Sequence, residues 1–393
     1  MRSGALLPWP AMSGAAVTLP PGEAARPRVP AWLGRLGEAM AVGGATLVLF
    51  PVCWLLRRVL GLDDAALAMG FLTFHAATVI NDPHFAVTYL LFYRDARARA
   101  FGDGFVRGQR VRWWVSGVLV PVALVAWAGV ALATRSAPLL GWMIQLMFFL
   151  VGWHYVKQGF GVLTVLSARR GVRWSEGERR VVLAHCFAGW AYAWASPADP
   201  GRLVEEKGVV YRSLTHPLHL ETATFVLFVA SALLLGAVLA RKWRRERRLP
   251  PLAPLCGLLV SVWLWTVYSA ADPLMRYLIP ALHSVQYLYF VWLLRRNEAR
   301  STEGPPHFGR PAAVQVGFLA VSAVILGWVV FRGGPSFLDD VLAVPSQRRL
   351  STMDDLGPTP YFAAIYAFVN IHHYFMDTVI WRRDNPATRH LFA

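Results

Sequence analysis

Histidine is the residue type in this 393-residue chain whose placement points most directly to chemistry. Eleven histidines are present, and seven of them fall inside long apolar runs: His75, His84, His154, His185, His283, His372 and His373. An ionisable side chain inside a membrane helix is costly, so it normally faces the bundle interior and marks a functional site. Neutral imidazole is also the commonest protein ligand for iron, zinc and copper. We therefore predict that these side chains share one polar chamber that binds a metal ion.

The predicted metal ligands come from different parts of the chain. We assign the ion to His154, His283, His372 and His373, with His75 and His84 as a second half-site. A ligating histidine usually donates its second N–H group to a carboxylate, an amide or a carbonyl. The candidates for such supporting interactions are Asp82, Gln158, Gln286 and Asn370. His185 lies at the inner end of its run, and an interfacial position without a ligand role is the alternative for it.

Two further ionisable residues are the predicted catalytic groups. Asp377 follows His373 by one helical turn, so both side chains lie on one helix face and Asp377 is expected to orient the His373 ring. Lys157 lies three residues after His154 and could bind an anionic headgroup or a carboxylate in the chamber. Its long side chain could instead extend to the lipid headgroups.

Pro83 lies between two of the predicted ligands within one apolar run. His75 and His84 are nine residues apart, and in an unbroken helix this spacing places them on opposite faces. Proline lacks a backbone N–H group and can kink or break a helix. A break at Pro83 would allow both histidines to face one cavity.

The elements that must position these residues are membrane helices. The chain is 56% hydrophobic and 16% charged, whereas soluble proteins contain about 25% charged residues. A helix needs about 20 apolar residues to cross a bilayer. Ten such runs are present: 38–56, 65–92, 113–133, 138–167, 179–196, 221–240, 252–271, 275–294, 312–331 and 359–381. The predicted fold is an all-α, polytopic membrane helical bundle with about ten transmembrane helices.

The formal net charge of +16 follows the predicted topology. If the N-terminus is cytoplasmic, 28 of the 39 basic residues lie in cytoplasmic segments and nine lie on the opposite side. This asymmetry is the positive-inside pattern and predicts an N-in/C-in orientation. It makes anionic membrane lipids the expected partners of these charges, in preference to nucleic acid. In this topology Asp82 falls on the cytoplasmic side of the histidines, while Arg332 lies in an outer connection.

One domain is expected to contain all of these spans. Residues 1–37 are rich in proline and alanine, which predicts a disordered cytoplasmic tail. Residues 38–383 form the single transmembrane domain, and residues 384–393 form a short cytoplasmic tail. The expected location is the bacterial type of cytoplasmic membrane, as a multi-pass protein.

The spread of single histidines over several helices resembles the sites of histidine-rich integral-membrane metal oxygenases. This group includes fatty-acid desaturases and hydroxylases and the bacterial membrane β-carotene dioxygenase family, and the dispersed pattern is more similar to the latter. The desaturase boxes HxxxH and HxxHH do not occur in the chain, and His372-His373 is its one histidine doublet. The resemblance concerns the style of site, and it implies metal-dependent oxidation of a lipid or isoprenoid.

The prediction for function is an integral-membrane, metal-dependent oxidoreductase of the oxygenase, hydroxylase or desaturase type. It would take a lipophilic substrate and an electron-transfer partner, with mono- or dinuclear iron as the cofactor and zinc or haem as alternatives. A proton-coupled transporter could use the same polar layer, with Lys157, Asp82 and Asp377 in its path. A haem-binding membrane protein could use two histidines on facing helices. A structural role, with each histidine hydrogen-bonded between helices, is the remaining alternative.

Overall fold

The computed structural model describes residues 31–248, 250–342 and 356–392 of the chain. The chain separates into two compact units, Met1–Gly37 and Glu38–Ala393, and the interactions discussed below lie within the second unit. Of the predicted N-terminal tail 1–37, residues 31–37 belong to helix α1, and residues 1–30 lie outside the described residues.

The described residues are nearly all helical, which confirms the predicted all-α class. In chain order the α-helices are α1 (Ala31–Ala39), α2 (Ala45–Leu60), α3 (Leu62–Ala77), α4 (Asn81–Tyr93), α5 (Ala96–Phe101), α6 (Arg107–Trp114), α7 (Val120–Ala133), α8 (Ala137–Arg169), α9 (Glu176–Ala195), α10 (Leu218–Glu246), α11 (Leu252–Leu259), α12 (Met275–Thr302), α13 (Ala312–Trp328), α14 (Gly334–Leu342) and α15 (Pro360–Ile380). The shorter segments are the π-helical η1 (Met40–Gly44), η2 (Val115–Leu119), η3 (Val260–Val267) and η4 (Val329–Gly333), and the 3₁₀ helix η6 (Pro386–Leu391), which lies in the predicted C-terminal tail.

Six helical stretches among the described residues are long and apolar enough to cross a membrane. They are Trp32–Leu60, Arg107–Ala133, Ala137–Arg169, Leu218–Glu246, Met275–Thr302 and Ala312–Leu342. Large apolar side chains on these stretches face outward, since Leu233 is 72% exposed and Phe318 is 71% exposed. A large apolar surface is unfavourable in water, whereas membrane hydrocarbon accommodates it. The chain is therefore consistent with a membrane protein, while the count of about ten spans and the N-in/C-in orientation stay predictions.

The predicted span 65–92 is wrong as a single helix. Helix α3 ends at Ala77, a turn follows, and α4 begins at Asn81. The break therefore precedes Pro83, which is the third residue of α4. In the first turn of a helix the backbone N–H groups have no intrahelical partner, so a proline there loses no hydrogen bond. The predicted span 252–271 is one continuous but shorter helix, Leu252–Val267, in which α11 continues directly into the π-helical η3.

A short antiparallel hairpin lies between α9 and α10. Strand β1 (Leu203–Glu206) pairs with β2 (Val209–Arg212), and the turn residues Lys207 and Gly208 have positive φ values of 52° and 81°. Two such residues suit the two-residue turn that joins twisted strands. Tyr211 of β2 packs on α8 at Gly141, where an added Cβ would lie 2.5 Å from the Tyr211 Cβ. The sequence predicts only a connection here, because each strand is four residues long.

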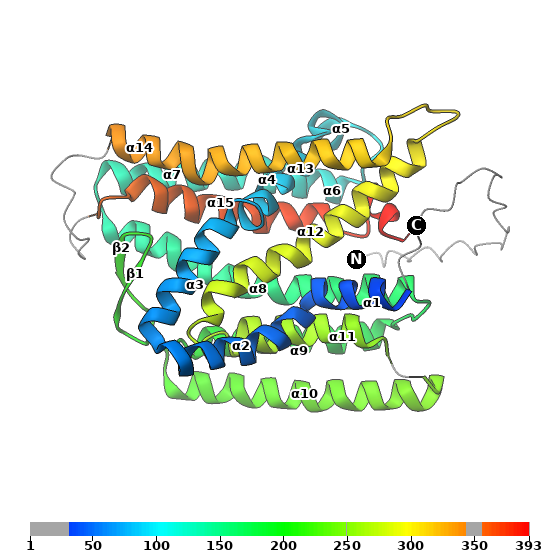
Figure 1. Ribbon diagram of the computed structural model, residues 1–393, viewed down its shortest axis with the longest axis horizontal. Coiled ribbons are helices and arrows are strands. Elements are labelled where there is room, and N and C mark those ends of the chain that lie inside the picture. The colour runs from blue at the N-terminus through cyan, green and yellow to red at the C-terminus, as the bar shows by residue number, and fades with distance from the viewer. Residues whose placement is uncertain (1–30, 249, 343–355, 393) are drawn as a thin grey trace. The chain divides into compact units, whose positions relative to one another are not determined.

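Helices α4, α8, α12 and α15 supply the candidate site. Within the second unit α15 contacts α8 and α4, and α4 contacts α12 (Figure 1). Helix α13 packs along α4, and Gly327 permits the close approach because a Cβ there would lie 2.7 Å from the Asp82 carbonyl carbon. The position of the first turn of α4 therefore depends on a small residue in α13.

Replacement of Gly327 by alanine is expected to destabilise the protein. The added methyl group meets backbone atoms of α4, and overpacking of this kind costs about 1–3 kcal/mol. Gly317 lies in the same helix with no atom within 4 Å of its added Cβ, so Gly317→Ala is the matched control. Thermal unfolding in detergent measures both variants, and equal unfolding midpoints would contradict the importance of this contact.

Candidate metal centre

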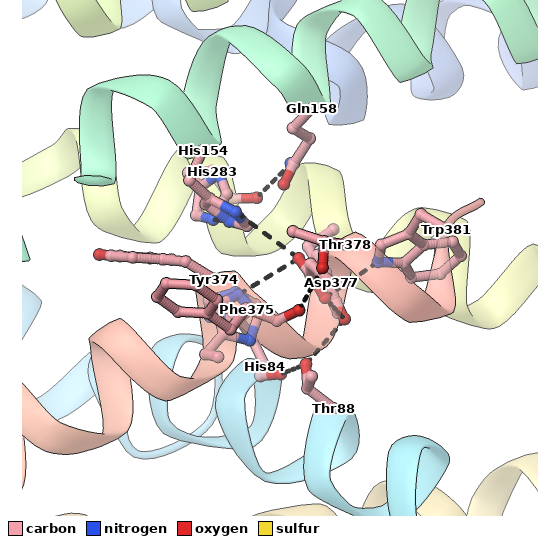
Figure 2. Close-up of polar contacts among 12 residues, drawn as sticks. His84, Thr88, His154, Gln158, His283, Tyr374, Phe375, Asp377, Thr378 and Trp381 are labelled. Carbon is pink, nitrogen blue, oxygen red and sulfur yellow. Dashed lines mark hydrogen bonds and ion pairs between the residues drawn. The ribbon is translucent and has the colours of Figure 1, made fainter. Parts of the chain in front are cut away.

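Four buried histidines lie together where α4, α8, α12 and α15 meet. They are His84, His154, His283 and His373, one from each helix, and each is at most 3% exposed. A ring nitrogen of each lies within 4.8 Å of those of the other three. Figure 2 shows His154 and His283 approaching from one side and His84 from the other. These four residues, which we call the histidine cluster, could bind a metal ion.

The nitrogen spacing in the histidine cluster fits a small ion. The Nε2 atoms of His84 and His373 are 3.1 Å apart, and those of His154 and His283 are 3.2 Å apart. Four nitrogens at bond lengths of about 2.0–2.1 Å around a tetrahedral ion lie about 3.3–3.4 Å from one another. Without an ion, each pair of rings can share one proton in an N–H···N hydrogen bond. The same side-chain positions therefore suit both hydrogen-bonded pairs and a shared metal ion.

Ser284 of α12 orients the His84 ring from α4. Its Oγ lies 3.1 Å from His84 Nδ1, and its one hydroxyl proton is within reach of two acceptors, Asn81 Oδ1 at 2.9 Å and the Pro280 carbonyl oxygen at 2.7 Å. In the tautomer of His84 that donates from Nδ1 to the Ser284 Oγ, the Nε2 lone pair points into the cluster. One serine therefore joins α12 to the first turn of α4 and selects the nitrogen that faces the other histidines.

Asp377 supplies a carboxylate beside the cluster. Its Oδ2 lies 3.5 Å from His373 Nε2 and 3.7 Å from His154 Nδ1. Its Oδ1 accepts a hydrogen bond from the Tyr287 hydroxyl at 2.9 Å. The same oxygen accepts the Trp381 indole N–H at 3.1 Å, as Figure 2 shows. Two donors hold one oxygen, so the other oxygen is directed at the histidines. The predicted pairing of Asp377 with His373 is thus extended to a second ring of the cluster.

Aromatic rings pack around the four histidines. The ring centroid of Tyr155 lies 4.5 Å from that of His283, and the ring centroid of Tyr374 lies 4.7 Å from that of His154. Tyr374 is itself held by Asn370, whose Oδ1 accepts its hydroxyl proton at 3.1 Å. Asn370, predicted to support a ligand directly, therefore acts on the cluster through Tyr374. These rings exclude water and restrict the rotation of the imidazoles.

Two of the six predicted ligands are not brought to the cluster. His372 faces away from His373, because consecutive helical residues point about 100° apart. Its Nε2 lies 2.9 Å from the Ser116 carbonyl oxygen, and its Nδ1 lies 2.9 Å from the Tyr89 hydroxyl. His75 is exposed and lies on α3 before the helix break, where its ring contacts Phe71 and Phe74. The predicted second half-site with His84 is therefore not formed.

The two predicted glutamine partners bind each other rather than the histidine rings. Gln158 Nε2 donates to Gln286 Oε1 at 2.7 Å and to the His283 carbonyl oxygen at 3.3 Å. Gln286 Nε2 in turn donates to the Val42 carbonyl oxygen at 2.6 Å. This chain of amides joins α8, α12 and η1 beside the cluster. The glutamines therefore position the helices that carry His154 and His283.

The remaining predicted residues lie outside the cluster. The Lys157 ammonium group lies 5.7 Å from the ring centroid of Phe160 and 5.9 Å from that of Phe187. His185 Nδ1 lies 3.0 Å from Ser231 Oγ, and its Nε2 accepts the Trp263 indole N–H at 3.1 Å. Both nitrogens of His185 are thus used in contacts between helices.

Asp82 is buried and forms an ion pair with the partly exposed Arg332. Its Oδ2 lies 3.2 Å from Arg332 Nε, and the Arg332 guanidinium also donates to the Phe74 carbonyl oxygen. The sequence predicts Asp82 on the cytoplasmic side and Arg332 in an outer connection, and their contact shows that these two expectations cannot both hold. The physical reason is that Arg332 lies within the continuous helical stretch Ala312–Leu342 and not in a connection, so the predicted end of that span at residue 331 is wrong.

Protein family models, curated proteins and solved structures give no match to this chain. The chemistry of the site has to be inferred from the side chains themselves.

Sequence reasoning missed several residues that hold the cluster in place. Ser284 and Trp381 are the clearest examples, through their bonds to His84 and Asp377. Helical spacing provides a signal for Trp381, because it lies four residues after Asp377. Residues four apart on a helix are neighbours, so this position could have been found from the aspartate.

Removal of the Arg332 charge alone is expected to destabilise the protein more than removal of both charges of the pair. Arg332→Gln leaves the Asp82 carboxylate buried without its partner, and breaking one half of a buried pair costs about 3–5 kcal/mol. Adding Asp82→Asn to this variant removes the isolated charge and should restore most of the stability that Arg332→Gln loses. Unfolding midpoints of the two single variants and the double variant complete the cycle. A double variant no more stable than Arg332→Gln would show that another contact is responsible.

Proposed function

We propose that the chain is an integral-membrane, metal-dependent oxidoreductase that acts on a lipid or isoprenoid at the histidine cluster. One observation carries the proposal, namely the convergence of ring nitrogens from four helices at one buried point. Histidines that only joined helices would be expected to hydrogen-bond to different neighbours, as His185 does. Convergence on one point is instead typical of a ligand set. The proposal includes a multi-pass bundle of about ten spans, N-in/C-in, in a bacterial cytoplasmic membrane.

Iron is the proposed metal because the proposed chemistry is an oxidation. Imidazole suits zinc, copper and iron alike, so the donor type alone does not decide between them. Zinc has no redox chemistry, whereas bound iron supplies electron transfer and dioxygen chemistry for oxidation of a hydrocarbon. Four donors within 4.8 Å suit one ion, so we favour a mononuclear site. The electrons would come from a separate electron-transfer partner.

The protein would contribute the binding and the environment of the ion. The four rings of the cluster would hold it, and the Asp377 carboxylate would offset part of its charge. Tyr287 and Trp381 keep Asp377 Oδ1 occupied, so Oδ2 is the atom able to accept or release a proton beside a bound substrate. Burial of the cluster excludes water and strengthens these electrostatic interactions.

Metal analysis of the detergent-purified full chain tests the ligand set. The wild type is expected to hold about one ion per chain, and His373→Ala should lose most of it because a fourth of the donors is removed. His372→Ala is the matched control, since His372 is the neighbouring buried histidine of α15 and bonds to Ser116 and Tyr89 instead. Sub-stoichiometric metal in the wild type, or equal losses in the two variants, would contradict the proposal.

Haem, the alternative cofactor, suits the cluster poorly. The ring centroid of His84 lies 4.5 Å from that of His373 and 5.0 Å from that of His283, so the imidazoles pack against one another. Two axial haem ligands would need a flat porphyrin between them. We expect the purified protein to show no Soret absorption band, and a strong band would favour a haem protein over the proposed enzyme.

The helix break before α4 favours a second candidate, a proton-coupled transporter. Broken helices that carry polar residues are common at transporter binding sites, and Asp82 follows the break directly. However, Asp82 pairs with Arg332 rather than with a member of the cluster. Lys157 lies against aromatic rings, so the three ionisable groups predicted for a proton path are held in separate contacts. The converging donor set therefore makes the enzyme the stronger proposal.

A further inference from the structure

An apolar cavity lies between α4, α7, α13, η4, α14 and α15. Its volume is about 490 Å³, which is in the range of sites that hold small ligands. Its lining side chains are apolar apart from the hydroxyl groups of Tyr89 and Tyr361. A buried water needs several polar partners, so a cavity of this composition suits hydrocarbon better than water.

The cavity opens on the outward face of α7. Val125 lines it and is 60% exposed, and Gly129, one turn further along, also lines it and is exposed. Helix α7 belongs to the stretch Arg107–Ala133, which is long and apolar enough to cross a membrane. A hydrocarbon chain in the surrounding bilayer could therefore enter sideways without passing through water.

Small residues on the facing helices create this space. Ala86 of α4, Ala128 and Gly129 of α7 and Ala364 of α15 line the cavity at positions where larger side chains would fill it. A Cβ added to Gly129 would have no atom within 4 Å. Because these small residues leave the space between the helices unfilled, a hydrocarbon chain can lie there.

One aromatic ring connects the cavity to the histidine cluster. The Phe85 ring centroid lies 5.0 Å from that of Phe331, which lines the cavity, and 5.0 Å from that of His373. Val369 also lines the cavity and precedes His373 by one turn of α15. The inner wall of the cavity is therefore one side chain away from a ring of the cluster.

We propose that this cavity binds the hydrocarbon chain of a membrane lipid and presents it to the histidine cluster, with Phe85 setting how closely the chain approaches. Oxidation of the bound hydrocarbon rests on the proposed function, whereas binding of the hydrocarbon in the cavity does not. Straight acyl chains and branched isoprenoid chains share the required chemistry. The volume and the lateral opening suit a flexible chain of either kind, and the two arms of the experiment distinguish them.

Photolabelling of the detergent-purified full chain tests the inference. The probes are palmitic acid and farnesol, each carrying a photoreactive diazirine, and mass spectrometry locates the label on the peptides. Gly129→Trp fills the cavity. Gly236→Trp is the matched control, because Gly236 is also an exposed helical glycine with no atom within 4 Å of its added Cβ, and it lies on α10 away from the cavity.

We expect at least one probe to label the cavity peptides of the wild type and of Gly236→Trp equally. In Gly129→Trp this labelling should fall about tenfold, which corresponds to the loss of about two buried methylene groups. The probe whose labelling falls in Gly129→Trp identifies the bound hydrocarbon as acyl or isoprenoid. Equal labelling of the two variants by both probes would overturn the inference.

Metal content measured on the same samples separates this inference from the proposed function. Wild-type protein that holds little metal but shows labelling sensitive to Gly129→Trp would overturn the proposed enzyme and support the cavity. Stoichiometric metal together with labelling insensitive to Gly129→Trp would overturn the cavity alone.

Discussion

A buried imidazole between apolar helices must find its hydrogen-bonding partner within the protein, because no water is at hand there. In this chain four such rings meet the requirement at their Nε2 atoms by facing one another in pairs, with nitrogen contacts of 3.1 and 3.2 Å, while the Nδ1 atoms of His283 and His373 have no hydrogen-bond partner among the described residues. Each ring comes from a different helix, so these contacts determine how α4, α8, α12 and α15 can lie relative to one another. The surrounding groups add further polar contacts, since Tyr287 and Trp381 hold Asp377 toward the rings.

The first turn of α4 is the part of the bundle where most of these constraints meet. Because the helix begins at Asn81, its opening residues carry backbone N–H groups that no intrahelical carbonyl satisfies, and polar side chains are favoured there. Asn81 reaches Ser284, Asp82 reaches Arg332, and His84 enters the cluster. Because all three residues lie in α4 itself, their side chains point in different directions around its first turn and reach three different neighbours. These polar contacts therefore lie at one depth of the bundle.

The members of the cluster could be predicted from the sequence because polar residues inside long apolar runs are rare and costly. Which of the candidate histidines join the cluster could not be predicted, because this depends on tertiary contacts. His372 is as well placed as its neighbour by helical spacing, and it is turned to the Ser116 carbonyl by packing. His75 is separated from the cluster by a break that the sequence predicts at Pro83 and that the structure places before Asn81. Gln158 and Gln286 could each reach a ring nitrogen or another amide, and only the packing of α8 on α12 selects the amide. The hairpin was missed because its strands are too short to show a pattern.

The π-helical segment Val115–Leu119, which offers its Ser116 carbonyl to His372, has a geometric consequence for the helix that follows it. A π turn contains one residue more than an α turn, and such turns behave as single-residue insertions into an α-helix. One residue corresponds to about 100° of rotation about the helix axis. Deletion of a residue here would swing Val125 and Gly129 around the circumference of α7 by that angle. A single insertion therefore sets which side of α7 lines the cavity and which side faces the lipid.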